Sequence, residues 1–271
     1  MEESIITSTQ NAKVKHVVAL QQKSAQRRKE GLFVVEGRRE LMHCLEAGYE
    51  IAECFVLDKL ADLADLADLA PLGSLESQVS LVSPQVYEKM AYRGSTEGVM
   101  AVVREKSLSL EDLQLGAAPL IMVLERVEKP GNLGAVLRSA DAAKADAVII
   151  CDPLTDLYNP NLIRSSIGAI FSVPCVACSS EACITFLKAH GIQILTAQLQ
   201  DSSLYYDTDM LGGTAIVMGT ESTGLTDVWR QAADAHIRIP MLGHLDSLNV
   251  SVSAAILLFE AVRQRQSVKP E

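Results

Sequence analysis

Long apolar runs are missing from this 271-residue chain. No stretch reaches the roughly 18 apolar residues that a membrane span needs. The acidic start, Met-Glu-Glu-Ser, also lacks the apolar core of a signal peptide. These two absences predict a soluble cytoplasmic protein with no membrane partner. Hydrophobic residues still make up 48% of the chain, which is enough to build a core in one large or two modest domains.

Disulfide and metal patterns are missing as well. The six cysteines show no disulfide framework, and a chain of this size does not need one. Cys175 and Cys178 form a lone C-x-x-C in a segment that resembles a strand, where residues three apart point to opposite faces. No second cysteine pair lies at zinc spacing, so the sequence predicts buried free thiols and no metal site.

A surplus of basic residues is also absent, because the formal net charge is −10. Nucleic-acid binding usually needs a basic surface, so this charge argues against it. The charge is uneven, however, since residues 10–39 carry eight basic side chains against two acidic ones. Such a stripe can steer RNA to an acidic protein, although a solvated helix face is the alternative. The stripe predicts RNA contacts at Lys13, Arg27, Arg28 and Arg38.

Apolar strands alternate with helices throughout residues 118–271. Strands are expected at 120–124, 147–150, 173–177, 192–196, 214–218 and 236–239. This alternation predicts an α/β domain whose sheet is mostly parallel, with helices on both faces. Residues 1–104 predict a smaller α/β domain that begins with a basic helix over 9–30, and residues 105–117 predict a linker.

Three polar segments that contain glycine or serine follow strands of the predicted sheet. They are Glu125–Ala140, Val217–Leu225 and Ile239–Ala255. Ligands of parallel sheets bind beyond the carboxyl ends of the strands, so these segments are expected to form one site. The third places Ser247 and Asn249 directly before an apolar helical run. A helix start leaves backbone N–H groups unpaired for a ligand, and an ordinary helix cap is the alternative.

In order and spacing, the three segments resemble the motifs of the SpoU (TrmH-type) RNA 2′-O-ribose methyltransferases of the SPOUT class. Tyr158-Asn159-Pro160 and Arg164–Phe171 are similar to the segment that links the first two motifs. The resemblance covers about residues 118–266, and a looser one covers roughly 28–104. It implies S-adenosylmethionine as cofactor, RNA as substrate, a homodimer and a C-terminal trefoil knot. Residues 1–104 resemble the RNA-binding domain that precedes many SpoU catalytic domains.

The resemblance also implies roles for individual side chains. The expected catalytic residues are Asn132, Arg138, Glu221, Ser247 and Asn249. The expected cofactor-binding residues are Thr196, Gly219, Ile239, Met241 and Leu248, and Arg164 is expected to contact RNA. The family often assigns proton abstraction to the arginine at 138. Because a guanidinium stays protonated, stabilising a forming alkoxide or binding a phosphate suits it better. A plain surface arginine is the alternative.

Other functions compete with ribosomal RNA methylation. A nucleotide-dependent oxidoreductase is one, because a strand, a glycine turn and a helix occur at 120–143. That turn reads Gly-Asn-Leu-Gly rather than G-x-G-x-x-G, which argues against it. A non-catalytic RNA-binding protein of the same fold is another, and the intact polar residues argue against that. A transfer-RNA methyltransferase stays open, as does the target nucleotide.

Overall fold

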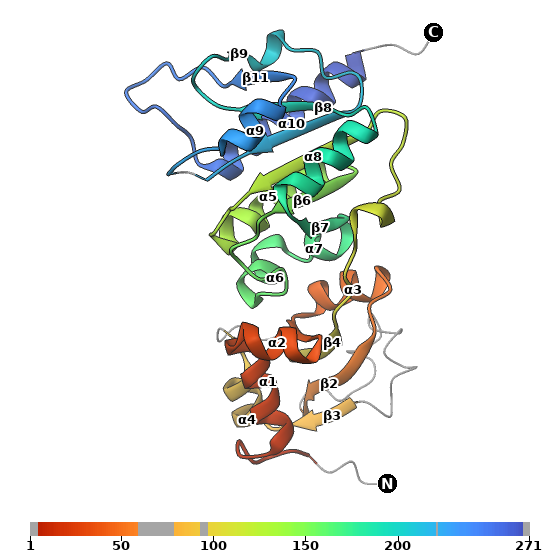
Figure 1. The fold of residues 1–271 in the computed structure, drawn as a ribbon. Coiled ribbons are helices and arrows are strands. Elements are labelled where there is room, and N and C mark those ends of the chain that lie inside the picture. The colour runs from red at the N-terminus through yellow and green to blue at the C-terminus, as the bar shows by residue number, and fades with distance from the viewer. Residues whose placement is uncertain (1–4, 59–78, 93–96, 221, 268–271) are drawn as a thin grey trace. The chain divides into compact units, whose positions relative to one another are not determined.

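The computed structural model describes residues 5–58, 79–92, 97–220 and 222–267. Figure 1 draws the fold with the chain coloured by residue number. The chain divides into two compact units. Unit 1 comprises Met1–Lys106 and Asp156–Ser172, and unit 2 comprises Ser107–Thr155 and Val173–Glu271. The chain therefore leaves unit 1 at the expected linker but returns to it for residues 156–172. Across the described ranges, no helix combines the length and apolarity that a bilayer span requires.

Unit 1 is built on a four-stranded sheet in the order β1-β4-β2-β3. Its strands are β1 (Leu32–Glu36), β2 (Ile51–Leu57), β3 (Val79–Val82) and β4 (Val99–Arg104). β4 pairs antiparallel with β1 and β2, whereas β3 pairs parallel with β2. Its helices are α1 (Ala12–Gln22), α2 (Ser24–Glu30), α3 (Arg38–Glu46), α4 (Pro84–Met90), α6 (Pro160–Ser166) and α7 (Ala169–Ser172). The single helix expected over 9–30 is two helices, because Lys23 has an extended backbone.

Apolar and aromatic contacts explain why residues 156–172 belong to unit 1. α1 turns Val14, Val17 and Leu20 into the core of the unit, where all three are buried. The ring of Phe33 on β1 stacks on Tyr158, with 4.2 Å between ring centroids. The hydroxyl of Tyr158 in turn donates to the carbonyl oxygen of Lys106 at 2.6 Å. The sequence pattern alone did not reveal this pairing.

Unit 2 contains a seven-stranded sheet in the order β7-β6-β5-β10-β8-β11-β9. Its strands are β5 (Leu120–Glu125), β6 (Ala147–Cys151), β7 (Cys175–Cys178), β8 (Gln193–Ala197), β9 (Ser203–Leu204), β10 (Thr214–Met218) and β11 (Ala235–Arg238). All of its described strand pairs are parallel. The expected parallel α/β fold is therefore confirmed. The two-residue strand β9 was not anticipated.

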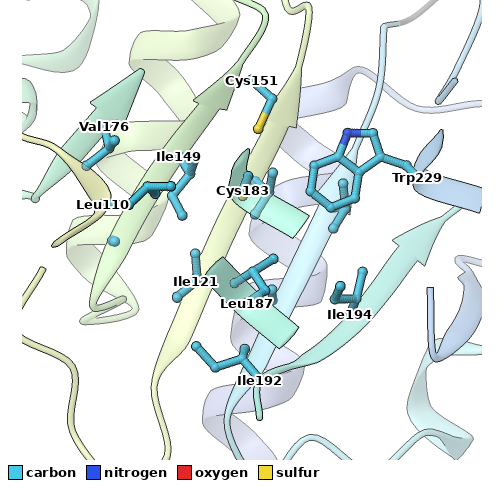
Figure 2. Packing of buried hydrophobic residues seen from close by; sticks show 14 of the residues in the cluster. Leu110, Ile121, Ile149, Cys151, Val176, Cys183, Leu187, Ile192, Ile194 and Trp229 are labelled. Atoms are coloured by element: carbon cyan, nitrogen blue, oxygen red, sulfur yellow. The ribbon is translucent and has the colours of Figure 1, made fainter. Parts of the chain in front are cut away.

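The helices of unit 2 are α5 (Pro130–Ala142), α8 (Ser180–Ala189), α9 (Asp227–Ala232) and α10 (Val250–Ser267). α5 packs along α10, and α10 also contacts β5 and β10. α8 and α9 pack on a different set of strand residues, including Ile121 and Ile149, through Leu187 and Trp229 (Figure 2). Because successive side chains of a strand point to opposite faces, this arrangement gives helices on both faces of the sheet.

Three of the six free cysteines gather at one edge of this core. The Sγ atoms of Cys151, Cys178 and Cys183 all lie within 4.8 Å of one another. Cys151 and Cys178 end the neighbouring strands β6 and β7, and Cys183 follows on α8. Cys178 is therefore grouped with Cys183, five positions later, and with the distant Cys151 rather than with Cys175. Cys151 and Cys183 are fully buried among apolar side chains, as Figure 2 shows.

Candidate functional site

The three sequence motifs follow β5, β10 and β11 of unit 2. These strands are parallel members of one sheet, so their carboxyl ends lie along the same edge. α5 starts with Pro130 in its first turn, where a proline has no N–H to leave unpaired. The side chain of Asn249 caps α10 by accepting a hydrogen bond from the N–H of Ser251 at 2.9 Å. The topology thus brings two helix starts to this edge.

A hollow of about 260 Å³ joins the three motifs. It is lined by Val127, Glu128, Lys129, Asn132, Gly219, Thr220, Ser222 and Val250. Beside it, Nδ2 of Asn249 donates to Oδ1 of Asn132 at 3.2 Å. These two amides are 117 positions apart in the chain. Asn249 therefore both caps a helix and bonds to the first motif.

The second motif folds back on itself so closely that only glycine fits at position 219. A Cβ placed there would lie 2.3 Å from both the carbonyl carbon and oxygen of Gly224. The N–H of Gly224 donates to the carbonyl oxygen of Thr220 at 3.0 Å, and Gly224 has a φ of +68°. Gly219 thus permits the close approach of the chain, and Gly224 adopts a positive φ that glycine tolerates. Gly219, Thr220 and Ser222 of this loop line the hollow.

A buried carboxylate ties the first motif to the second. Glu125 ends β5 and is 2% exposed. Its Oε2 accepts the N–H of Thr226 at 2.8 Å, and its Oε1 accepts the Thr226 hydroxyl at 2.6 Å. Thr226 is the N-cap residue of α9, directly after the glycine loop. Glu125 thereby fixes where that loop leaves the sheet edge. The sequence marked this residue as part of a motif but gave no sign of its partner.

A second hollow, of about 480 Å³, lies along the segment that follows β11. Its walls include Ile239, Met241 and the exposed Leu199, with Arg238 and Asp246 as polar members. Leu248, also expected to bind cofactor, is 40% exposed beside the start of α10. The structure thus places the two hollows at the same sheet edge.

The other expected site residues of unit 2 are more scattered. Thr196 is fully buried at the end of β8, and its Oγ1 lies 2.6 Å from Nδ1 of His236. Ser247 is exposed just before α10. Arg138 is exposed on α5, nearly two turns beyond Asn132, and lines neither hollow. Glu221 lies outside the described residues.

The residues expected to contact RNA all lie in unit 1. Lys13 on α1 and Arg28 on α2 are exposed, and Arg38 at the start of α3 is half-buried. Arg164 is exposed at the end of α6. Arg27 differs, because its side chain is 5% exposed. With that burial, the guanidinium has almost no surface to offer RNA.

The guanidinium of Arg27 donates hydrogen bonds to groups inside unit 1. Its Nε donates to Oδ2 of Asp156 at 2.6 Å, and one terminal nitrogen donates to the carbonyl oxygens of Leu20 and Gln21. A buried guanidinium is tolerated only when it is paired and hydrogen-bonded in this way. Its position assigns Arg27 to the structure of unit 1.

Comparison with known proteins gives two family matches. The SpoU rRNA Methylase family matches residues 119–259, and the MRM3-like substrate binding domain matches residues 11–101. The 23S rRNA (guanosine(2553)-2′-O)-methyltransferase RlmP of Bacillus subtilis is 28% identical over 254 residues, which span 94% of this chain and 97% of that protein.

Two solved structures resemble the whole chain. An RNA 2′-O ribose methyltransferase superposes with a TM-score of 0.84 and 38% identity, over 97% of this chain and 100% of that one. An AdoMet-bound rRNA methyltransferase from Sinorhizobium meliloti gives a TM-score of 0.87 and 27% identity, over 98% of this chain and 99% of that one.

Proposed function

The chain belongs to the SpoU rRNA methylase family, and from that membership we infer that it is an S-adenosylmethionine-dependent RNA 2′-O-ribose methyltransferase. Its proposed substrate is ribosomal RNA, which the name of the Bacillus relative supports. A cytoplasmic location is part of this proposal, because ribosomal RNA is found there. The division into an RNA-binding domain at 1–104, a linker at 105–117 and a catalytic domain at 118–271, with its trefoil knot, is proposed with it.

One observation carries the proposal: the hydrogen bond between Asn132 and Asn249, beside the hollow that Gly219 also lines. Three segments far apart in the chain supply one site with backbone groups, amides and apolar walls. A dinucleotide-binding oxidoreductase would need a glycine-rich phosphate turn with a different spacing. Three separate segments that meet at one site can contact different parts of a nucleoside-containing cofactor.

The residues at this edge fit S-adenosylmethionine. The cofactor supplies a methyl group on an activated sulfonium, so the protein need provide neither a metal nor a covalent nucleophile. Ile239 and Met241 offer apolar walls to an adenine ring. The loop at Gly219, whose shape depends on the close approach of Gly224, offers backbone groups that suit the polar part of the nucleoside.

The ribose has to be oriented and its 2′-oxygen has to lose a proton. The amides of Asn132 and Asn249 are the proposed ribose contacts. Ser247 and Glu221 are proposed as further catalytic residues. Arg138 stabilises the negative charge that develops on the 2′-oxygen, or holds the adjacent phosphate. Met241, Leu248 and Thr196 remain on the cofactor side, and the buried Thr196 would act there by supporting the end of β8.

A homodimer is proposed as the active form. Leu242 and Leu245 are 96% and 78% exposed, and Val252 and Phe259 on α10 are each 47% exposed. Large apolar side chains grouped along one segment and its helix favour a protein interface. Light scattering at micromolar concentration should give twice the chain's 29.3 kDa. A stable species of single-chain mass would contradict the dimer.

Methyl transfer tests the proposed function. The purified protein is incubated with tritiated S-adenosylmethionine and, separately, with ribosomal and transfer RNA from cells that lack the gene. Label should enter ribosomal RNA and survive alkaline hydrolysis within a dinucleotide, because a 2′-O-methyl group blocks cleavage of the neighbouring phosphodiester.

Asn132→Ala should remove most of this incorporation, whereas Gln266→Ala, which truncates an exposed amide on α10, should not. Label released as single nucleotides would place the methyl group on a base and refute ribose methylation. Incorporation into transfer RNA alone would refute the ribosomal substrate.

A further inference from the structure

Unit 1 contains a cavity of about 320 Å³ where β1 meets the start of α3. Val34 and Ile163 give it an apolar part, and Arg39 and Arg164 are exposed lining residues. Glu36 and Tyr92 also line it. The volume lies within the range of small-molecule pockets, and every lining residue belongs to unit 1. The site of methyl transfer proposed above uses none of them.

The carboxylate of Glu36 is the unusual group in this cavity. Its Oε2 accepts the N–H of Tyr92 at 2.9 Å. Its Oε1 is buried and has no hydrogen-bond partner among the described residues. Burial raises the pKa of Glu36, and the positive charge of Arg164 partly opposes that rise. A buried acceptor without a donor is unfavourable, so a ligand that brings N–H groups would relieve it.

We propose that this cavity binds a guanine base of the RNA substrate, with the Glu36 carboxylate accepting hydrogen bonds from the base. The proposal rests on the RNA methyltransferase function inferred above. Guanine carries two adjacent donors, N1–H and the 2-amino group, which match the two oxygens of one carboxylate. Uracil has a single donor between two acceptors, and adenine and cytosine present one amino group beside an acceptor. Guanine is therefore the base that fits this group.

The charges around the cavity favour a base inside and a phosphate outside. Glu36, Glu40 and Glu97 all line the cavity, and they would repel a phosphate. Arg39 and Arg164 are exposed, where guanidinium groups can pair with the RNA backbone. Aromatic rings and guanidinium planes are also the surfaces on which single-stranded bases stack in proteins.

A metal ion is a poorer occupant of the same cavity. Oε2 of Glu97 accepts the N–H of Arg38, and Oε1 of Glu40 lies 3.6 Å from Arg39. These partners already use much of the acceptor capacity of the two carboxylates. In the described part of the chain, the ligating atoms close enough to share an ion are three thiols in unit 2. The carboxylates of the cavity do not form such a group.

Binding of short RNAs to the full-length protein tests the proposal. Fluorescence anisotropy measures the affinity for fluorescein-labelled octauridylates that carry one central guanosine, inosine, adenosine or cytidine. Inosine keeps N1–H but lacks the 2-amino group. The guanosine RNA should bind about tenfold more tightly than each of the others, because one good bidentate contact supplies discrimination of that order.

Glu36→Gln should reduce the ratio between guanosine and inosine RNA to below about twofold, because an amide oxygen replaces two acceptors. Glu46→Gln makes the same chemical change in the same unit, at the end of α3, where the side chain is 66% exposed, and should keep the tenfold ratio. Equal affinity of the unaltered protein for guanosine and inosine RNA would overturn the proposal, even if Glu36→Gln does not fold. Preference for adenosine or cytidine, or a ratio retained by a folded Glu36→Gln, would overturn it too.

Methyl transfer to ribosomal RNA, measured on the same preparation, separates this inference from the proposed function. Transfer without any guanosine preference removes the cavity proposal and leaves the enzyme. Guanosine preference without transfer supports the cavity and removes the proposed activity.

Discussion

Unit 1 and unit 2 place their polar groups in opposite ways. In unit 2 the polar groups of the proposed site, among them Glu128, Lys129 and Asn132, gather at the ends of parallel strands, where the topology brings them. In unit 1 the charged side chains are divided between surface and interior, as neighbours Arg27 and Arg28 show. A site set by strand order can be located from sequence. A site set by which charge is buried requires the three-dimensional structure.

The largest effect is expected where unit 1 buries a charge. Arg27→Ala should lower the free energy of unfolding by about 3–5 kcal/mol, because it leaves Asp156, only 12% exposed, without its buried partner. Urea unfolding followed by circular dichroism measures this loss. Arg28→Ala, at the exposed neighbour, should change stability by less than about 0.5 kcal/mol. Equal losses for the two variants would remove the distinction between them.

In unit 2, loss of the charge of Arg138 should lower the rate of methyl transfer rather than the stability. Arg138→Ala should lower the single-turnover rate of methyl transfer by about 10²–10³, the effect of losing one stabiliser of developing charge. Cofactor affinity, measured by calorimetry, should stay unchanged. Arg138→Lys should not restore the rate, because a point charge cannot reproduce a planar fork. Near-normal transfer by Arg138→Ala would make this arginine a plain surface residue, and lost cofactor binding would move it into the pocket.

The tight loop at Gly219 in unit 2 gives the next prediction. Gly219→Ala should weaken S-adenosylmethionine binding by about 10–100-fold, because its Cβ would collide with the backbone of Gly224 and the loop must shift. Calorimetric titration measures the affinity. Gly212→Ala is the matched control, since a Cβ there meets nothing within 4 Å. Unchanged affinity in Gly219→Ala would show that the cofactor does not depend on this loop.

The difference between the two units also explains which of their features could be predicted from the sequence. Apart from β9, the strands of unit 2 were predicted to within about two residues, because apolar runs mark them, and the motif order gave the position of Gly219. The partner of Glu125 was out of reach, since Thr226 lies 101 positions away. Arg27 was mistaken for a surface residue by counting charge, because its partner Asp156 is 129 positions away. Local sequence carries periodicity but not the identity of distant partners.

The smallest expected effect concerns the exposed part of the basic stripe in unit 1. Arg28→Ala should weaken RNA binding only a few-fold at low salt, because one phosphate contact of several is removed. Its clearer signature is the dependence of affinity on salt, since each neutralised phosphate releases condensed counterions. The slope of log K against log salt should become shallower by about 0.7 for single-stranded RNA.

Arg230→Ala, at an exposed arginine on α9 of unit 2, is the matched control and should leave the slope unchanged. If both variants changed the slope equally, RNA would not discriminate between the stripe and the rest of the surface. If neither did, the stripe would be an ordinary solvated helix face, and RNA recognition by unit 1 would rest on its cavity.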